Sequence, residues 1–370
     1  MSTEDFVTRL GAELHAAALR EEHRSTLGSR LASLRYAMPR GAAVAAGALA
    51  ALLVGAVIAL GGLDWGAKET VTTPKVIRTF SLADDLGPMT SGFGSVWAVD
   101  RARGGLLRVD PASGRVQERL PGSKDAVINA GAGAVWVLDA NGPLGDPARG
   151  GRVLRIDPAS GRVASRAPLL PPSGAQFSPI DVVFAGGAPW VIGGEGALRI
   201  DPDTGRPDRL VATRPADGEP FPMWTTVDDE GLWVLTRDQR IVRYDLGSGR
   251  RELSIPMTFT GARTLTPSPD GAVLTANGEV ALASASDGKL AWRASIGTGA
   301  IGPPAIEGDT AIFHASGGPG GRDRMVALDL ETGKVRWAVP LPEFGITGAT
   351  KVGRQIWIAT PSGRVVVLER

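Results

Sequence analysis

A six-residue phrase that recurs along the chain constrains its fold more than any other feature. Asp110–Arg115 reads Asp-Pro-Ala-Ser-Gly-Arg, and Asp157–Arg162 repeats it letter for letter. Asp201–Arg206 keeps all but the two central residues, and looser copies follow. Self-similarity of this kind indicates one supersecondary unit that is repeated along the chain.

Each repeat contains four short runs that have the composition of β-strands. In the second repeat these runs are residues 126–129, 134–138, 153–157 and 162–166. They are rich in Val and Ile and are separated by Gly, Pro, Asp and Ser, which is the pattern of strands joined by tight turns. We therefore expect every repeat to form a four-stranded antiparallel sheet.

One bulky apolar position per repeat counts the units. These positions are Trp97, Trp136, Trp190, Trp233, Leu274, Phe313 and Trp357, and they are 39 to 54 residues apart. Four-stranded repeats of roughly 40–45 residues are typical of β-propeller blades. The sequence thus predicts an all-β, seven-bladed β-propeller over residues 75–370, in which these side chains pack one blade on the next.

The last repeat is one strand short, and the missing strand is expected from the other end of the propeller segment. Residues 75–82 read Lys-Val-Ile-Arg-Thr-Phe-Ser-Leu and resemble the fourth strand of the second repeat, Arg162–Leu169. We expect them to complete the seventh blade, so that no sheet edge is left open at the seam. The Asp of each repeated phrase is read as a turn residue, because Asp caps turns and the Gly that follows tolerates positive φ.

An apolar run precedes the propeller. Residues 41–63 contain no charged side chain and, at about 1.5 Å per residue, are long enough to cross a hydrocarbon core of about 30 Å. Arg30, Arg35 and Arg40 precede the run, so the positive-inside rule places residues 1–40 in the cytoplasm and the propeller outside it. A cleaved signal peptide is the alternative, but its charged and apolar parts would both be unusually long.

The sequence also allows roles for the segments around the apolar run. Small residues recur at a spacing of four along the apolar run, and this stripe could pair two such helices into a homodimer, although an Ala- and Gly-rich segment produces such stripes by chance. The stripe consists of Ala43, Gly47, Ala51, Gly55 and Ala59. Residues 1–40 are expected to be partly helical, either as a docking element or as a short tail that fixes topology. Residues 64–74 are a linker.

Composition limits the partners of the chain. The chain has no Cys, which suits an oxidising compartment without requiring one. Its formal net charge is +1 and it contains no basic run, so we expect no nucleic-acid partner. Of its 40 basic residues only six are Lys, and together with the abundant Ala and Gly this suggests a GC-rich, bacterial source.

Few residues are suited to catalysis. His314 is the one His within the propeller segment, and no cluster of His offers a metal site or a catalytic triad. No G-x-S-x-G or P-loop motif is present. We therefore predict no catalytic residues, no metal and no cofactor.

The long connections, in contrast, are expected to gather at one face of the propeller, where variable loops usually carry binding. They are the connections between the second and third strands and those between blades, while the short uniform turns lie at the other face. The candidate ligand-face residues are Asp139, Phe177, Asp217, Glu219, Phe221, His314, Arg322 and Arg324.

Two groups of propellers resemble these repeats. Residues 326–337, Val-Ala-Leu-Asp-Leu-Glu-Thr-Gly-Lys-Val-Arg-Trp, are similar to the repeat of pyrroloquinoline-quinone (PQQ)-like propellers, and residues 284–292 are a weaker copy. Residues 133–137 with 153–158 resemble the YVTN and virginiamycin B lyase types. The resemblance implies the propeller fold over residues 75–370. It implies PQQ only with a Cys pair that this chain lacks, and lyase activity only with a His-containing magnesium site.

Taken together, the sequence favours a single-pass membrane protein whose extracytoplasmic propeller binds or senses a protein, a wall polymer or a small ligand. The alternative is a propeller enzyme, either a virginiamycin B lyase-like lyase or a PQQ-dependent dehydrogenase. Fold alone does not decide between them.

Overall fold

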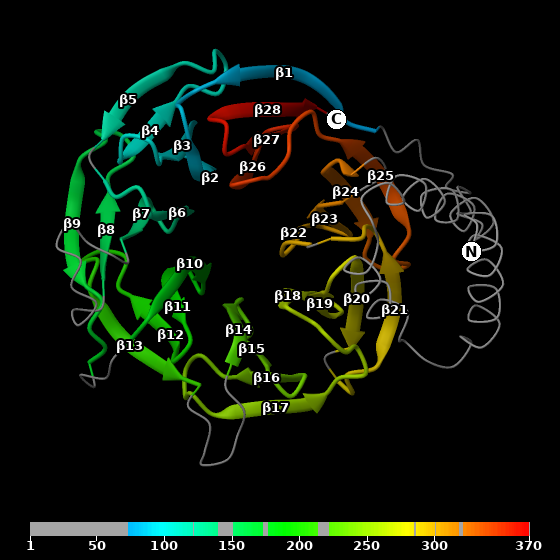
Figure 1. Ribbon diagram of the computed structural model, residues 1–370. Coiled ribbons are helices and arrows are strands. Elements are labelled where there is room, and N and C mark those ends of the chain that lie inside the picture. Colours follow the sequence, from blue (N-terminus) through cyan, green and yellow to red (C-terminus); the bar gives the residue numbers. More distant parts are fainter. Residues whose placement is uncertain are drawn as a thin grey trace, which may run out of the picture. The chain divides into compact units, whose positions relative to one another are not determined.

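The described part of the chain is a ring of seven four-stranded antiparallel sheets (Figure 1). The computed structural model describes residues 73–120, 122–139, 151–172, 177–213, 222–284, 286–299, 301–317 and 321–369. The predicted seven-bladed propeller is therefore confirmed. The expected cytoplasmic segment, the apolar run 41–63 and all but the end of the linker lie outside the described residues. Within the described ranges, no helix is long and apolar enough to cross a membrane.

Each of the first four blades is formed by four consecutive strands. Blade 1 contains β2 (Leu86–Gly92), β3 (Ser95–Asp100), β4 (Leu106–Val109) and β5 (Val116–Leu120). Blade 2 contains β6 (Val127–Gly131), β7 (Ala134–Asp139), β8 (Arg152–Ile156) and β9 (Val163–Pro168). Blade 3 contains β10 (Pro179–Ala185), β11 (Ala188–Gly193), β12 (Gly196–Ile200) and β13 (Pro207–Ala212). Blade 4 contains β14 (Pro222–Val227), β15 (Leu232–Thr236), β16 (Arg240–Tyr244) and β17 (Arg251–Pro256).

The last three blades follow the same plan, except that the final one borrows a strand. Blade 5 contains β18 (Thr264–Ser268), β19 (Gly271–Thr275), β20 (Glu279–Ser284) and β21 (Leu290–Ser295). Blade 6 contains β22 (Ala305–Glu307), β23 (Thr310–Ala315), β24 (Arg324–Asp329) and β25 (Val335–Pro340). Blade 7 contains β26 (Gly348–Val352), β27 (Gln355–Ala359), β28 (Arg364–Glu369) and β1 (Lys75–Ser81).

The seam of the ring is closed as the sequence predicts. β1 pairs antiparallel with β28, from Lys75 opposite Glu369 to Ser81 opposite Arg364. The Phe80 ring meets the Trp357 ring edge-on at 5.4 Å, a geometry that aromatic quadrupoles favour. Strand pairing and a shared aromatic contact therefore tie the start of the propeller to its end.

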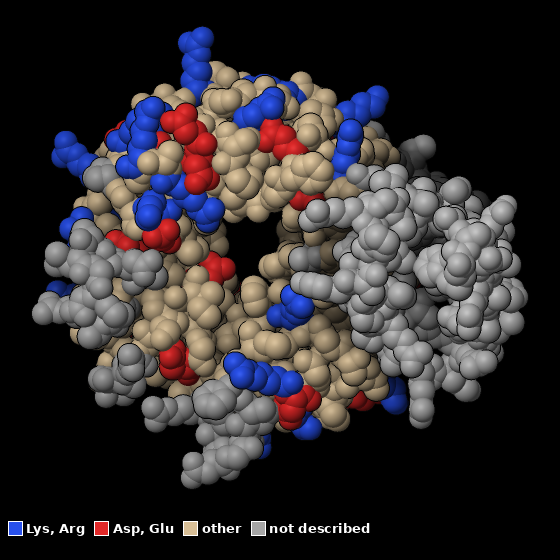
Figure 2. All heavy atoms as spheres, viewed as in Figure 1, with Lys and Arg blue, Asp and Glu red and all other residues tan. Residues whose placement is uncertain are grey.

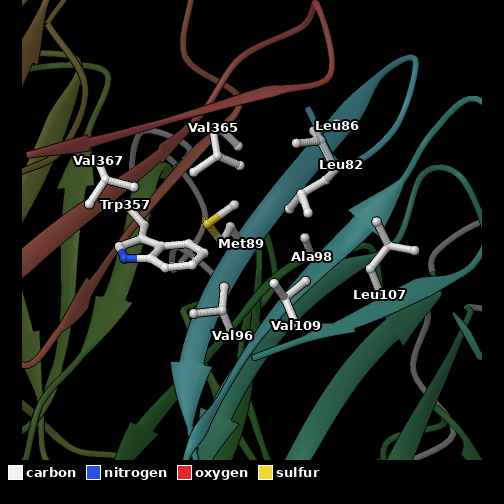
Figure 3. Packing of buried hydrophobic residues seen from close by; sticks show 11 residues of the cluster. Leu82, Leu86, Met89, Val96, Ala98, Leu107, Val109, Trp357, Val365 and Val367 are labelled. Atoms are coloured by element: carbon white, nitrogen blue, oxygen red, sulfur yellow. The ribbon is translucent and has the colours of Figure 1, made fainter. Parts of the chain in front are cut away.

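The core lies between the blades. Seven clusters of buried apolar side chains are described, one at each of the seven blade interfaces. Figure 3 shows the cluster at the seam, where Trp357 of blade 7 lies against Met89 and Val96 of blade 1. The seven bulky positions that count the repeats are all at most 3% exposed, which confirms their predicted role in packing.

The repeated phrase forms the turn between the third and fourth strands. In blade 2, Asp157 Oδ1 accepts hydrogen bonds from the Ser160 backbone N–H and hydroxyl, both at 2.7 Å. These donors hold the pKa of the Asp157 carboxyl below its ordinary value. Gly161 follows with φ of 68°, a conformation that glycine adopts without strain. The phrase is thus a structural turn, as predicted.

The two faces of the ring differ in their connections. Because successive strands are antiparallel, the turns from first to second and from third to fourth strand lie at one face, called here the turn face. The connections from second to third strand and from blade to blade lie at the other, called here the loop face. The first strand of each blade lies nearest the axis (Figure 1). It follows a blade-to-blade connection and precedes a turn, so it runs from the loop face to the turn face.

Candidate binding cavity

A cavity of about 900 Å³ lies on the axis of the ring. First strands of six blades supply most of its wall, namely β2, β6, β10, β14, β22 and β26. Figure 2 shows an opening at the centre of the ring, and the surface around it is mostly neither acidic nor basic. Cavities of this size, with apolar walls and few polar groups, are typical of ligand sites.

Four large apolar side chains are exposed at the loop face of the ring. Ile180 and Met223, near the starts of β10 and β14, line the cavity and are 59% and 38% exposed. Leu170 and Phe344 lie in blade-to-blade connections of the same face and are 55% and 68% exposed. We call these four residues the apolar rim. Large apolar side chains that are exposed on one face of a protein are candidates for an interaction site.

Two acidic groups lie at opposite ends of the cavity. Glu307 ends β22 near the turn face, and its carboxylate lies 3.2 Å from Lys351 Nζ. Asp181 is the third residue of β10 and lies near the loop face. Within the described residues, Asp181 forms no ion pair. The charge of Glu307 is therefore compensated, whereas that of Asp181 is not.

The protein around Asp181 offers its carboxylate little support. Its Oδ1 accepts a hydrogen bond from the Val182 backbone N–H at 2.7 Å, and the described residues supply no other donor. Burial disfavours the ionised form and raises the pKa of Asp181 to about 6. The carboxylate is thus held in the cavity wall at a cost that no neighbouring cation offsets.

A neighbouring amide fixes the backbone beside Asp181. Asn129 of β6 donates from Nδ2 to the Val182 carbonyl oxygen at 3.0 Å. Its Oδ1 accepts from Thr90 Oγ1 at 3.2 Å and from the Ala130 N–H at 2.9 Å. This network joins the first strands of blades 1, 2 and 3, so that Asp181 stands on a braced part of the wall.

His314, one of the candidate ligand-face residues predicted from the sequence, also lines the cavity. It lies on β23, and its Nε2 is 2.9 Å from Asp323 Oδ2. The same carboxylate oxygen accepts the Gly345 backbone N–H at 2.7 Å. Asp323 therefore fixes the imidazole and also ties the β23–β24 connection to the connection that carries Phe344.

The structure separates the other predicted ligand-face residues. Asp139 is 5% exposed and is bound by Arg152, whose Nε lies 3.1 Å from Asp139 Oδ2. Phe177 is 2% exposed and packs in the cluster between blades 2 and 3, so its ring belongs to the core and not to an exposed ligand surface. Asp217, Glu219 and Phe221 lie outside the described residues.

The two arginines near the mouth differ from one another. Arg322 is exposed in the β23–β24 connection. Arg324 is partly buried and donates to the Ile296 carbonyl oxygen, and burial lowers its pKa. Within the described ranges, no group of three or more His, Asp or Glu side chains has the arrangement of a metal site.

Sequence reasoning missed Asp181 and all four residues of the apolar rim. One signal was available, because Asp181 is the sole charged residue in the strand Pro179–Ala185. Its position in a first strand then places it toward the axis. The repeat, however, draws attention to positions that recur, and Asp181 does not recur.

Comparisons with known proteins support the fold. Residues 237–370 match the family model described as outer membrane protein assembly factor BamB. The match includes residues 326–337, where a PQQ-like repeat was expected, and confirms that repeat. No curated protein matches the chain.

Solved structures share the propeller fold over most of the chain. The crystal structure of BamB from Moraxella catarrhalis is 15% identical, with a TM-score of 0.53 over 80% of this chain and 100% of that one. The computationally designed Ika8 protein is 12% identical, with a TM-score of 0.55 over 78% of this chain and 98% of that one. At these identities the likeness shows the propeller fold and nothing finer.

Proposed function

We propose that this chain is a membrane-anchored binding protein whose propeller lies outside the cytoplasm and holds a protein partner at the loop-face mouth. The observation that carries the proposal is the apolar rim, which lies at the loop face and includes two residues, Ile180 and Met223, that line a cavity of about 900 Å³. Burying such side chains against a partner is favourable by roughly 25 cal/mol per Å² of apolar surface. A rigid ring that presents exposed apolar side chains is suited to this task.

Two further observations support a protein as the partner. The family model that matches residues 237–370 is named for an outer membrane protein assembly factor, and such a factor acts on other proteins. The rim residues Leu170, Ile180, Met223 and Phe344 come from the entries to blades 3, 4 and 7, and are thus distributed over the loop face rather than forming one small pocket. A surface distributed in this way suits an extended chain segment better than a compact metabolite.

The anchor is proposed from the sequence. Residues 41–63 are apolar throughout and follow Arg30, Arg35 and Arg40, so the positive-inside rule directs the propeller away from the cytoplasm. Protease added to intact spheroplasts would then degrade the propeller and spare residues 1–40.

Site-specific photo-crosslinking tests the binding function in native membranes. A photoreactive benzoyl-phenylalanine in place of Phe344, 68% exposed at the loop face, is expected to capture a partner protein in a discrete adduct. The matched control is the same group in place of Phe93, which is 45% exposed in a turn at the opposite face. Equal adducts at both positions, or none at Phe344, would contradict the proposal.

A second candidate, an enzyme acting in the cavity, is favoured by one contact. His314 lines the cavity and is oriented by buried Asp323, as a general base is oriented by a carboxylate. The two functions differ in the effect of His314→Ala. The enzyme would lose its turnover, whereas the partner adduct at Phe344 would remain.

A further inference from the structure

We propose that Asp181 is the receptor for a basic side chain, a lysine or an arginine, carried by an apolar segment of the partner that enters the loop-face mouth. This inference rests on the proposed binding function and names the chemistry of the partner. Three observations lead to it: the uncompensated carboxylate, its position below the apolar rim, and the bracing of its strand.

The charges that line the cavity point to a missing cation. Glu307 and Lys351 neutralise each other at 3.2 Å, and His314 is held by Asp323. Among the described residues that line the cavity, Asp181 alone carries a charge without a counter-charge. A cation brought by a partner would complete the set.

The carboxylate of Asp181 also has free capacity for donors. Oδ1 accepts one hydrogen bond, from the Val182 N–H, and no donor from the described residues reaches Oδ2. A carboxylate offers about four lone-pair sites, so an ammonium or guanidinium group finds acceptors in place. Although burial raises the pKa of this carboxyl to about 6, the group is mostly ionised at neutral pH, so a cation placed beside Oδ2 would form a strong, charge-assisted contact.

The apolar residues next to Asp181 select how that cation is carried. Ile180 precedes Asp181 in β10, and Met223 lies on β14 of the next blade, and both line the same cavity. Lys and Arg place an apolar stem behind a charged head, so the stem would lie along Ile180 and Met223 while the head reaches Asp181. Apolar neighbours in the partner segment would cover the remaining rim.

The wall at Asp181 is rigid enough for selective binding. Asn129 holds the Val182 carbonyl at 3.0 Å and is itself held by Thr90. The carboxylate is therefore positioned before a partner arrives, and preorganisation of this kind reduces the entropic cost of binding.

Selection of random linear peptides on the full-length protein in nanodiscs tests the inference without knowledge of the partner. Wild type is expected to recover peptides in which Lys or Arg is flanked by apolar residues. Asp181→Asn, which keeps the shape and the acceptor for Val182 N–H, is expected to bind the recovered peptides about tenfold or more weakly. Replacing the basic residue of a recovered peptide by norleucine is expected to cause a similar loss in wild type and almost none in Asp181→Asn.

Glu307→Gln is the matched control, because it removes one negative charge from the same cavity at the position already paired with Lys351. Binding of the recovered peptides is expected to change by less than about twofold in this variant. Circular dichroism and thermal melting of each variant would confirm that the propeller is intact.

Three outcomes would overturn the inference: no peptide recovered by wild type, no enrichment of basic residues, or equal loss in Asp181→Asn and Glu307→Gln. The adduct at Phe344 separates this failure from that of the proposed function. If the adduct persists while the peptide result is negative, the mouth binds a partner whose recognition does not use Asp181. If the adduct is also absent, both proposals fail.

Discussion

At the scale of single residues, aspartate has two opposite environments in this propeller. Asp110, Asp157, Asp201 and Asp245 lie in solvent-exposed turns, where hydrogen bonds from the following residues lower the pKa of each carboxyl. Asp181 lies in the cavity wall, where burial raises its pKa to about 6. Folding therefore favours the ionised form of the four turn aspartates, whereas it disfavours the ionised form of Asp181.

The stability of Asp181→Asn is expected to reveal this cost. The folded pKa of Asp181, about 6, is above its ordinary value of 3.8, so its ionisation lowers stability progressively as pH rises between these values. Above about pH 6 the full penalty applies, at most about 3 kcal/mol for such a shift, and below about pH 4 it vanishes. Asp181→Asn should therefore be more stable than wild type near neutral pH and equally stable in acid.

Urea unfolding of both proteins across this pH range measures the effect as a difference. Other titratable groups of the cavity, namely Glu307, Lys351 and His314, are common to both proteins and largely cancel. A variant that is less stable than wild type at neutral pH would show that Asp181 supports the fold rather than a partner.

The turn aspartates were predictable from the sequence, and Asp181 was not. Each turn Asp makes contacts within three residues along the chain, as Asp157 does with Ser160, so a local motif defines its role. The burial of Asp181 depends on blades that lie far away in the sequence and meet only when the ring closes. Asp139 and Phe177 illustrate the same limit, because both follow or precede long loops but are buried by neighbours.

At the scale of the element, the glycine of the repeated turn has two functions. It adopts positive φ, and in most blades it also lies against the outer strand of the preceding blade. A Cβ on Gly333 would lie 2.6 Å from the Trp292 side chain, and one on Gly114 would lie 3.0 Å from Phe80. Gly249 has a φ of 70°, close to the 68° of Gly333, yet nothing lies within 4 Å of its added Cβ.

This difference provides a matched pair of substitutions. Gly249→Ala is expected to lower the free energy of unfolding by about 1–2 kcal/mol, the cost of a left-handed conformation. Gly333→Ala has the same conformational cost and must also displace Trp292, which adds about 1–3 kcal/mol. The difference between the free energies of unfolding of the two variants in urea measures the cost of displacing Trp292 alone. Equal losses would mean that the outer strand of blade 5 moves away freely.

The order of the strands was predictable because each strand carries its own composition and turn signal. The strand that was expected over residues 75–82 to complete the seventh blade is β1, Lys75–Ser81, which pairs with β28. The shape of the cavity mouth was not predictable, since Ile180 and Met223 lie near the starts of β10 and β14, Phe344 lies in a connection between blades, and the exposure of all three is set by the assembled ring.

At the scale of the whole molecule, the ring has seven apolar interfaces and one seam. Six of these interfaces join blades that are neighbours along the chain. The seam, in contrast, joins β1 and β28, which are separated by almost the full propeller segment. Loop-closure entropy rises only slowly with length, so the cost of this joining is modest. Pairing of β1 with β28 and the cluster around Trp357 can therefore offset it.

Substitutions in β1 measure how much the seam contributes. Phe80 is partly buried and contacts Trp357, and Phe80→Ala is expected to lower the free energy of unfolding by about 2 kcal/mol, below the 3–5 kcal/mol typical of a fully buried Phe. Val76→Ala changes an exposed residue of the same strand and should change stability by less than about 0.5 kcal/mol. If ring closure is cooperative, Phe80→Ala will also expose residues near β1 to limited proteolysis at temperatures below global unfolding. A variant that frees β1 to protease without loss of overall stability would show instead that six interfaces hold the ring and that the seam is only a cover for its edge.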